Sequence, residues 1–397
     1  MPDERNLTDW IDGFMQLTEN SEPPRLFRKW TGISTIASAL QRKVRVELGL
    51  SLTIYPNFYI VLVGPPATGK GTAMKFAEDI ISNVPSIRLS AQATSLQALI
   101  KRMKETNLTD LDVKTNTMTY HSSMTIFSNE FTVFLGYHNR ELIAALCDWY
   151  DCHKRWSYET IKREKEEIYG VWVNILAGTT ADNIQSSLPL EAIGGGLTSR
   201  IIFVNEDKRE KLVIFPSASE AELELQQMLI NDLEQIALMS GVFQYTEDAA
   251  SLYAEWCVEA DVNPPFVDRK FEGYCGRRRR HINSLAMVCS ASRSNEMIIT
   301  KADLARAITL LHEVELKMGT VFRGIGKSDI SSLIHESIMY IQRSSDNEIP
   351  LHQFARRFEG DADKLMIDRV LSTLESMNYI TVIKKPGVGT IIHRTDG

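Results

Sequence analysis

The sequence predicts an α/β fold, followed by a helical region and a small C-terminal module. An apolar run at residues 57–63 leads into a glycine-rich loop and then a helical pattern at residues 73–77. Further short apolar runs, separated by helical segments, are interpreted as core strands. These runs lie at residues 123–130, 171–178 and 201–204. From residue 219 onwards the apolar spacing is helical, with helices expected at 220–239, 247–262, 277–292 and 301–318.

The most specific motif is the loop after the first of these strands. It reads Gly64-Pro65-Pro66-Ala67-Thr68-Gly69-Lys70-Gly71-Thr72, a G-x-x-x-x-G-K pattern between a strand and a helix. Gly64 and Gly69 allow a tight turn that aims backbone N–H groups at phosphate oxygens, and the next helix adds its positive N-terminal end. Lys70 is expected to reach the β- and γ-phosphates. The loop therefore predicts binding of ATP, with Mg²⁺ as its usual companion.

The metal ligands depart from the usual pattern. The residue after the lysine normally supplies a hydroxyl to Mg²⁺, but here it is Gly71, and Thr72 comes one place later. Asn129 stands where a second acidic residue is usual. We expect Thr72 and Asn129 to contribute to the metal site, Asn129 through water. The Lys-Gly-Thr ending also resembles the adenylate kinase variant of this loop.

Composition narrows the class of protein. The chain has 397 residues, 44% of them hydrophobic, and a net charge of −7. This charge argues against a uniformly basic coat for nucleic acid, although a local basic lining remains compatible with it. No apolar run is long enough for a membrane span, and the N-terminus lacks a signal-peptide pattern. The five cysteines form no C-x-x-C pair, so we expect a cytoplasmic protein in a reducing compartment.

The chain is expected to comprise four parts. Residues 1–50 form an N-terminal helical segment with helices at 7–17 and 26–40 and a strand at 44–48, and residues 51–215 form the α/β core. Residues 216–323 form a helical lid. After a linker at 324–328, residues 329–397 show three helices followed by two strands, the pattern of a winged helix.

Within the core we expect three smaller features. A short strand is expected at residues 86–90, followed by a helix at 95–104 capped by Thr94 or Ser95. Residues 106–122 are polar and are interpreted as a surface insertion. Residues 155–170 are expected to form a hairpin.

Three polar residues at strand ends are candidates for catalysis. Glu130 ends an apolar strand, where a carboxylate polarises the attacking water in related ATPases; the alternative is an ordinary strand-end carboxylate. Thr179 lies at the end of another strand, where a hydroxyl could orient water or contact the γ-phosphate; the alternative is ordinary capping of the next helix, which Thr180-Ala181-Asp182 could start. Arg200 enters a core strand behind Gly194–Gly196 and could act as an arginine finger, or form a surface salt bridge.

These motifs, in this order, resemble the AAA+ ATPases. The Ser199–Phe203 run resembles the arginine-finger motif of the minichromosome maintenance helicases, and the hairpin before Val171 is similar to their pre-sensor hairpin. Residues 25–320 more closely resemble replication ATPases of phages and integrated elements. The shared motifs are Tyr55-Pro56-Asn57-Phe58-Tyr59, Ser128-Asn129-Glu130 and a Gly-Gly-Gly-Leu-x-Ser-Arg run. The resemblance implies a homo-hexameric ring, with Arg200 reaching a neighbour's nucleotide and DNA threaded past central hairpins.

Basic residues then become candidates for DNA contacts. Lys162, Arg163 and Lys165 lie at or near the hairpin tip, beside Trp156 and Tyr158. The alternative is a solvated turn, because interleaved glutamates cancel the charge. The run Arg277-Arg278-Arg279-Arg280 is expected at the head of a helix. Its resemblance-based roles are a nucleotide sensor in the lid and DNA contacts, and the alternative is a solvated basic face. The charge-balanced C-terminal module is expected to contact DNA or to dock proteins.

The first hypothesis is an ATP-dependent DNA translocase or replicative helicase of a phage or mobile element, acting on single-stranded DNA. The alternative is an ATP-regulated replication initiator or helicase loader, which would assemble on duplex origin DNA and meet other replication proteins. A small-molecule nucleotide kinase is a third possibility, suggested by Lys-Gly-Thr and disfavoured by Arg200 and the winged module.

Overall fold

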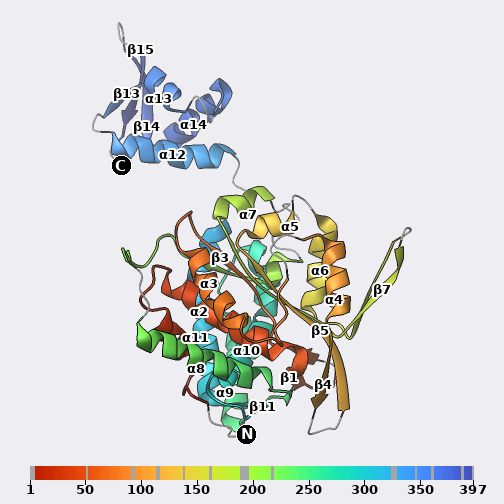
Figure 1. Ribbon diagram of the computed structural model, residues 1–397. Helices are drawn as coiled ribbons and strands as arrows, with labels where there is room; N and C mark the ends of the chain where they lie inside the picture. The colour runs from red at the N-terminus through yellow and green to blue at the C-terminus, as the bar shows by residue number, and fades with distance from the viewer. Residues whose placement is uncertain are drawn as a thin grey trace. The chain divides into compact units, whose positions relative to one another are not determined.

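The computed structural model describes residues 5–50, 52–90, 94–112, 117–136, 139–160, 163–187, 196–215, 219–322, 329–344, 347–358, 362–385 and 389–395. The chain divides into two compact units, residues 1–322 and 323–397 (Figure 1). Both combine helices and sheets, so the predicted α/β class is confirmed. Among the described residues, no helix is both long and apolar enough to cross a membrane.

A five-stranded sheet forms the centre of unit 1, with the order β4-β5-β8-β3-β9. Strands β5 (Thr117–Ser128), β8 (Val171–Thr179), β3 (Tyr59–Val63) and β9 (Ile201–Asn205) run parallel. Every residue of β3, β8 and β9 is buried. Their near-continuous apolar sequences are those of parallel strands covered on both faces. The predicted core strands are therefore confirmed.

Helices cover this sheet. Helices α2 (Arg25–Leu40), α3 (Lys70–Ile81), α6 (Arg140–Tyr150) and α11 (Lys301–Met318) all contact its strands. Helix α4 (Leu96–Glu105) contacts β5, and the Ser95 hydroxyl caps it by accepting a hydrogen bond from the N–H of Ala98. Of the two expected caps, Ser95 is the one that acts. Short helices α5 (Phe131–Leu135) and α7 (Ala181–Ser187) follow β5 and β8, and the 3₁₀ turn Thr198–Arg200 precedes β9.

The N-terminal segment is part of the same unit. Helix α1 (Trp10–Leu17) packs on α2 and on α8 (Glu220–Ala237), and the Trp10 indole donates to the carbonyl of Leu229. After the 3₁₀ turn Gln41–Lys43, the predicted strand at 44–48 is confirmed as β1 (Val44–Leu48). Strand β1 pairs with β2 (Leu52–Ile54) and with β10 (Gly241–Val242). Residues 1–50 therefore pack with the core and with the helical region.

Two expectations for the core were wrong. Residues 106–122 are not a loop-like insertion, because β4 (Asn107–Asp112) pairs antiparallel with the first half of β5. The alternation of polar and apolar residues there suits an edge strand with one face in solvent. Residues 86–90 do not form a full strand; Leu89 makes one isolated parallel bridge to Thr125.

The predicted hairpin is confirmed as β6 (Arg155–Thr160) and β7 (Arg163–Tyr169). Figure 1 shows the β4–β5 and β6–β7 hairpins extending beyond the body of unit 1 on the right of the view. Both hairpins therefore present surface to which another molecule can bind.

The helical region contains α8, α9 (Glu247–Val262), α10 (Glu272–Arg293) and α11, as expected. Helix α10 begins at Glu272 and not at Arg277, after the 3₁₀ turn Arg269–Phe271. Thr300 and Asp303 form a capping box at the start of α11. Strands β11 (Gln244–Tyr245) and β12 (Ile298–Ile299) pair with each other, and the 3₁₀ turn Gly319–Phe322 ends the region.

The described residues of the C-terminal unit form three helices and a three-stranded antiparallel sheet of order β13-β15-β14. The helices are α12 (Asp329–Arg343), α13 (Leu351–Arg357) and α14 (Lys364–Ser376). The expected strands are β14 (Ile380–Lys385) and β15 (Gly389–Arg394). Strand β13 (Glu348–Pro350) was not foreseen because it is only three residues long. An apolar cluster that includes Phe354, Val370 and Leu374 gives this unit its own core.

Candidate functional site

Three of the parallel strands bring Lys70, Glu130 and Thr179 to the carboxyl end of the sheet. Val63, the last residue of β3, lies opposite Thr179 of β8 and Asn205 of β9. Strand β5 runs parallel to β8 and ends at Ser128, directly before Asn129 and Glu130. The carboxyl ends of parallel strands lie at the same end of a sheet. Glu130 and Thr179 therefore lie close to the loop that follows Val63.

The loop itself requires glycine at two positions. A Cβ atom on Gly64 would lie 2.5 Å from the carbonyl oxygen of Glu206. Gly69 has a φ of 90°, in the left-handed region, and a Cβ there would lie 2.9 Å from Cα of Pro23. Gly69 is also the N-cap of α3, where no side chain caps the helix. The first-turn N–H groups of α3 therefore point into the loop and suit an anion.

Lys70 lies over this loop. Its Nζ donates to the carbonyl oxygens of Gly64 at 2.6 Å and Pro65 at 2.9 Å. Burial lowers the pKa of Lys70, and the charge of Glu130 acts in the opposite direction. The loop thus holds a positive charge at the carboxyl edge of the sheet, facing the carboxylate of Glu130.

Glu130 and Thr179 form a bonded pair. The Thr179 hydroxyl donates to Oε1 of Glu130 at 2.6 Å, and the Thr132 hydroxyl donates to the same oxygen at 2.8 Å. Within the described part of the chain, Oε2 accepts no hydrogen bond, so it is available to a water molecule. The expected capping of the next helix is also present, because the Thr180 hydroxyl accepts a hydrogen bond from the N–H of Asn183 in α7.

The two expected metal ligands lie apart. A Cβ on Gly71 would be 3.7 Å from Oδ1 of Asn129, so Asn129 is beside Gly71. Thr72 instead lines a cavity of about 530 Å³. The other walls of this cavity come from the α1–α2 connection, α8 and residue Val213. Thr72 therefore lies next to the loop but lines this cavity, whereas Asn129 lies beside Gly71.

Arg200 lies at the other edge of the sheet. Ile201, the next residue, pairs with Tyr59 at the start of β3, whereas the loop follows its end. Arg200 is only 8% exposed; its Nη2 is 2.6 Å from Oδ2 of Asp151, and its Nη1 donates to the carbonyl of Gly196 at 2.6 Å. It forms the salt bridge considered as the alternative, but in a buried setting rather than at the surface.

The four arginines of α10 are separated by the helix and do not form one basic face. Arg278 makes a buried double hydrogen bond with Glu315 of α11, at 2.7 and 3.0 Å. Arg279 is exposed and lies 3.7 Å from Asp261. A solvated basic face therefore describes Arg279 alone.

The remaining two arginines lie close to Arg200. Arg280 donates to Oδ1 of Asn57 at 3.1 Å and to the carbonyl of Tyr150, and Arg277 donates to the carbonyl of Gly273 at 3.2 Å. The expected position at a helix head was wrong, because the first turn of α10 precedes Arg277. Asn57 and Tyr150 were not foreseen as partners, since contacts 223 and 130 residues away leave no local pattern.

The β6–β7 hairpin carries both aromatic and charged side chains. Trp156 and Tyr158 stack with ring centroids 6.1 Å apart. Lys165 lies 3.0 Å from Glu167, which also pairs with Arg155. These cations hold the pKa of Glu167 at about 2, mainly through the Arg155 hydrogen bond. The charge of Lys165 is thus largely compensated.

The other cations expected at the hairpin tip fall outside what the structure describes. Residues 161–162, with Lys162, lie outside the described residues, as does the side chain of Arg163. The linker at 324–328 and Gly194 and Gly195 also fall outside them. The expected roles of these residues stay predictions.

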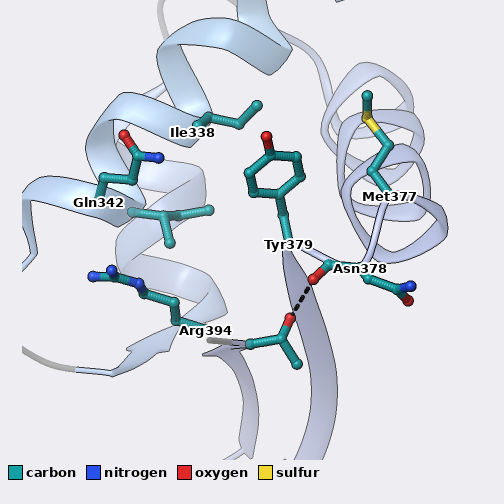
Figure 2. A pocket seen from close by; sticks show the side chains of 8 residues that line it. Ile338, Gln342, Met377, Asn378, Tyr379 and Arg394 are labelled. Carbon is teal, nitrogen blue, oxygen red and sulfur yellow. Dashed lines mark hydrogen bonds between the residues drawn. The ribbon is translucent and has the colours of Figure 1, made fainter. Parts of the chain in front are cut away.

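A separate pocket lies in the C-terminal unit (Figure 2). It has a volume of about 460 Å³ and lies between α12, the turn after α14 and the end of β15. Figure 2 shows the ring of Tyr379 between Ile338 and Met377. Arg394, the last residue of β15, also lines the pocket. The Thr395 hydroxyl donates to the carbonyl of Asn378 at 2.7 Å and ties the chain end to the turn.

Comparison with protein-family models and with characterised proteins finds no match for this sequence. The functional assignment below therefore depends on the arrangement of the described residues and on the motifs in the sequence.

Proposed function

We propose that the chain is an AAA+ P-loop ATPase that works as an ATP-dependent DNA translocase or replicative helicase in a homo-hexameric ring. The observation that carries this proposal is the strand order β5-β8-β3-β9. It places the loop, Lys70 and the Glu130–Thr179 pair at one edge and Arg200 at the other. This arrangement supports the proposal of an ATP site that a neighbouring subunit completes.

The residues at the carboxyl edge fit a nucleotide triphosphate. The uncapped start of α3 and the glycines of the loop supply N–H donors and space, and Lys70 supplies positive charge. Bound Mg²⁺·ATP would supply the phosphoanhydride and the charge compensation that its hydrolysis needs. Glu130 would orient water through Oε2 while Thr179 and Thr132 hold its other oxygen. Asn129, beside Gly71, would reach the metal through water.

Arg200 cannot serve the loop of its own subunit. The two are separated by β3, whose five residues span about 13 Å between the first and last Cα atoms. An arginine finger acts by placing its guanidinium on the transferring phosphate. We therefore assign Arg200 to the nucleotide of the neighbouring subunit, which requires a ring or filament of identical copies.

Single-stranded DNA is the proposed substrate of this motor. The β6–β7 hairpin projects from unit 1 and carries the stacked Trp156–Tyr158 pair together with Lys162, Arg163 and Lys165. Aromatic stacking and backbone cations are the usual means of binding single strands. The C-terminal unit, with three helices and the β14–β15 hairpin, is proposed as a winged helix.

ATP hydrolysis with and without single-stranded DNA tests the proposal. We expect hydrolysis that DNA stimulates, strand separation on a forked duplex, and loss of both in Lys70→Ala and Glu130→Gln. Lys75→Ala is the matched control, because Lys75 lies on α3, is exposed and pairs with Asp79 at 2.5 Å. Equal activity in Lys70→Ala and Lys75→Ala would refute the assignment of the site.

A second candidate function is an ATP-regulated initiator or helicase loader. Gly71 favours it, because the usual metal hydroxyl is missing and Thr72 lies on another face of α3. Such a protein would hydrolyse ATP slowly and assemble on duplex origin DNA in response to ATP. Light scattering with a slowly hydrolysed ATP analogue, together with the DNA-stimulated rate, separates the two functions.

A further inference from the structure

Three arginines gather around one carboxylate at the edge of the sheet opposite the loop. Arg200 lies 2.6 Å from Asp151, and Arg280 lies 3.7 Å from its other oxygen. Arg277, one turn before Arg280 on α10, is close enough to interact electrostatically with Arg200 and Asp151. Among the described residues, Asp151 is the only carboxylate within ion-pair distance of these three guanidinium groups.

The cluster therefore carries excess positive charge in a largely buried place. The Nε atoms of Arg200 and Arg280 are buried, and neither has a hydrogen-bond partner in the described structure. Both guanidinium groups bond through their Nη atoms, but each Nε is a buried donor left unsatisfied, so a further acceptor that carries negative charge would stabilise the cluster. Guanidinium groups bind phosphate in a planar, often paired geometry, and this makes phosphate the best matched anion.

We propose that Asp151 holds Arg200 in a withdrawn position, and that the terminal phosphate of a nucleotide bound to a second copy of the chain replaces this carboxylate on assembly. The inference depends on the proposed function and goes beyond it by naming the group that restrains the arginine. The exchange is a change of partner for Arg200 and breaks no covalent bond. Asp151 is thus a positioning residue, because it acts through Arg200.

The geometry makes this exchange feasible. The Asp151 side chain is 35% exposed, so the ion pair is open to solvent on one side. When Arg200 leaves, Arg280 stays 3.7 Å from Asp151, so the carboxylate keeps a cationic partner. Arg200 must also release the carbonyl of Gly196, which is an exposed residue in a turn. The cost of release is therefore that of one hydrogen bond and of an ion pair that is buried on the Arg200 side and partly exposed on the Asp151 side.

Asp151→Asn tests the inference. The amide no longer competes for Arg200, so half-maximal ATP hydrolysis should occur at a protein concentration about two- to fivefold lower than in the wild type. Glu141→Gln is the matched control, because it removes one negative charge from an exposed position on the same helix. It should leave the concentration dependence unchanged. Asp151→Asn combined with Arg200→Ala should behave as Arg200→Ala alone.

Arg277→Gln gives an independent test should Asp151→Asn fold poorly. It removes a cation that compensates Asp151 after release, so half-maximal hydrolysis should move to a higher protein concentration. Hydrolysis by Asp151→Asn that is unchanged or weaker, or unchanged hydrolysis by Arg277→Gln, would overturn the inference while leaving the ATPase intact. Absence of hydrolysis in the wild type and in Glu141→Gln would instead overturn the proposed function, and this inference with it.

Discussion

Introducing a hydroxyl directly after Lys70 is the most direct test of the Mg²⁺ site that we propose at the loop. A Cβ on Gly71 meets only Oδ1 of Asn129, at 3.7 Å, which is ordinary van der Waals contact. Gly71 lies in α3 and is not among the residues with positive φ. Serine therefore fits without displacing a neighbour, and its hydroxyl starts from the carbon that faces Asn129.

Two effects of Gly71→Ser can be separated by size. Replacing glycine in a helix raises the free energy of unfolding by about 0.5 kcal/mol, which corresponds to roughly 1 °C in melting temperature for a unit of this size. A hydroxyl that binds the metal contributes about 1 kcal/mol. The Mg²⁺ concentration for half-maximal hydrolysis should therefore fall about fivefold.

Gly71→Ala is the matched control, because it adds the same Cβ without the hydroxyl; alanine is the stronger helix former, so its stabilisation should be somewhat larger, about 1 kcal/mol. ATP hydrolysis is measured over a Mg²⁺ titration at saturating ATP for the wild type and both variants. We expect Gly71→Ser alone to shift the titration, while both variants melt slightly higher. Equal shifts in the two variants, or no shift in either, would refute the idea that Gly71 occupies the metal-ligand position.

Three further predictions concern packing and pH. Gly64→Ala puts a Cβ 2.5 Å from a backbone carbonyl oxygen, so we expect the free energy of unfolding to fall by about 1–3 kcal/mol. We also expect the variant to lose binding of a fluorescent ATP analogue. Unchanged binding of the analogue would contradict the close approach. Glu315→Ala leaves Arg278 buried without its partner and should cost about 3–5 kcal/mol in urea unfolding, whereas a change below about 1 kcal/mol would show that the pair is dispensable. Burial lowers the pKa of His281 from the ordinary value of 6.5 to about 3. As pH falls, the unfolded protein therefore takes up a proton on His281 before the folded protein does. The free energy of unfolding should then drop by about 1.4 kcal/mol per pH unit below pH 6.5, and His281→Gln should lack this part of the slope in urea titrations.

The glycine-rich loop between β3 and α3 and the strands around it were predictable because their signals are local. The apolar run before Gly64 and the helical pattern after Lys70 lie within about twenty residues of each other. The meeting of Glu130 and Thr179 was also predictable in outline, since parallel strands share their carboxyl edge. Their direct hydrogen bond depends on side-chain geometry that spacing does not specify, whereas the helix cap at Thr180 was predictable from the residues that follow it.

The arginine partners were not predictable for a different reason. Arg278 pairs with a glutamate 37 residues away, and Arg200 with an aspartate 49 residues before it. Four consecutive arginines look like one basic surface in the sequence, but a helix turns successive side chains by about 100° and so divides them. The first turn of α10 was missed because glycine at 273 and 276 weakens its helical pattern.

The edge hairpin was missed because its polar composition resembles that of a loop. Residues 107–112 and 117–122 form a regular antiparallel ladder, in which Tyr120 and Met118 are largely exposed. An edge strand with one solvated face needs few apolar residues. Polarity alone therefore does not distinguish such a strand from an insertion.

The apolar composition of β3 determines how a movement at one end of the strand reaches the other end. Its residues, Tyr59 to Val63, are at most 1% exposed and are apolar apart from the hydroxyl of Tyr59, which donates to Leu146 on α6. No relay of polar side chains runs along this strand from one edge to the other. Because close-packed interiors resist local compression, a change at Gly64 can pass along β3 only as a displacement of the whole strand. We therefore expect β3 to move as one rigid element, so that its two ends shift together.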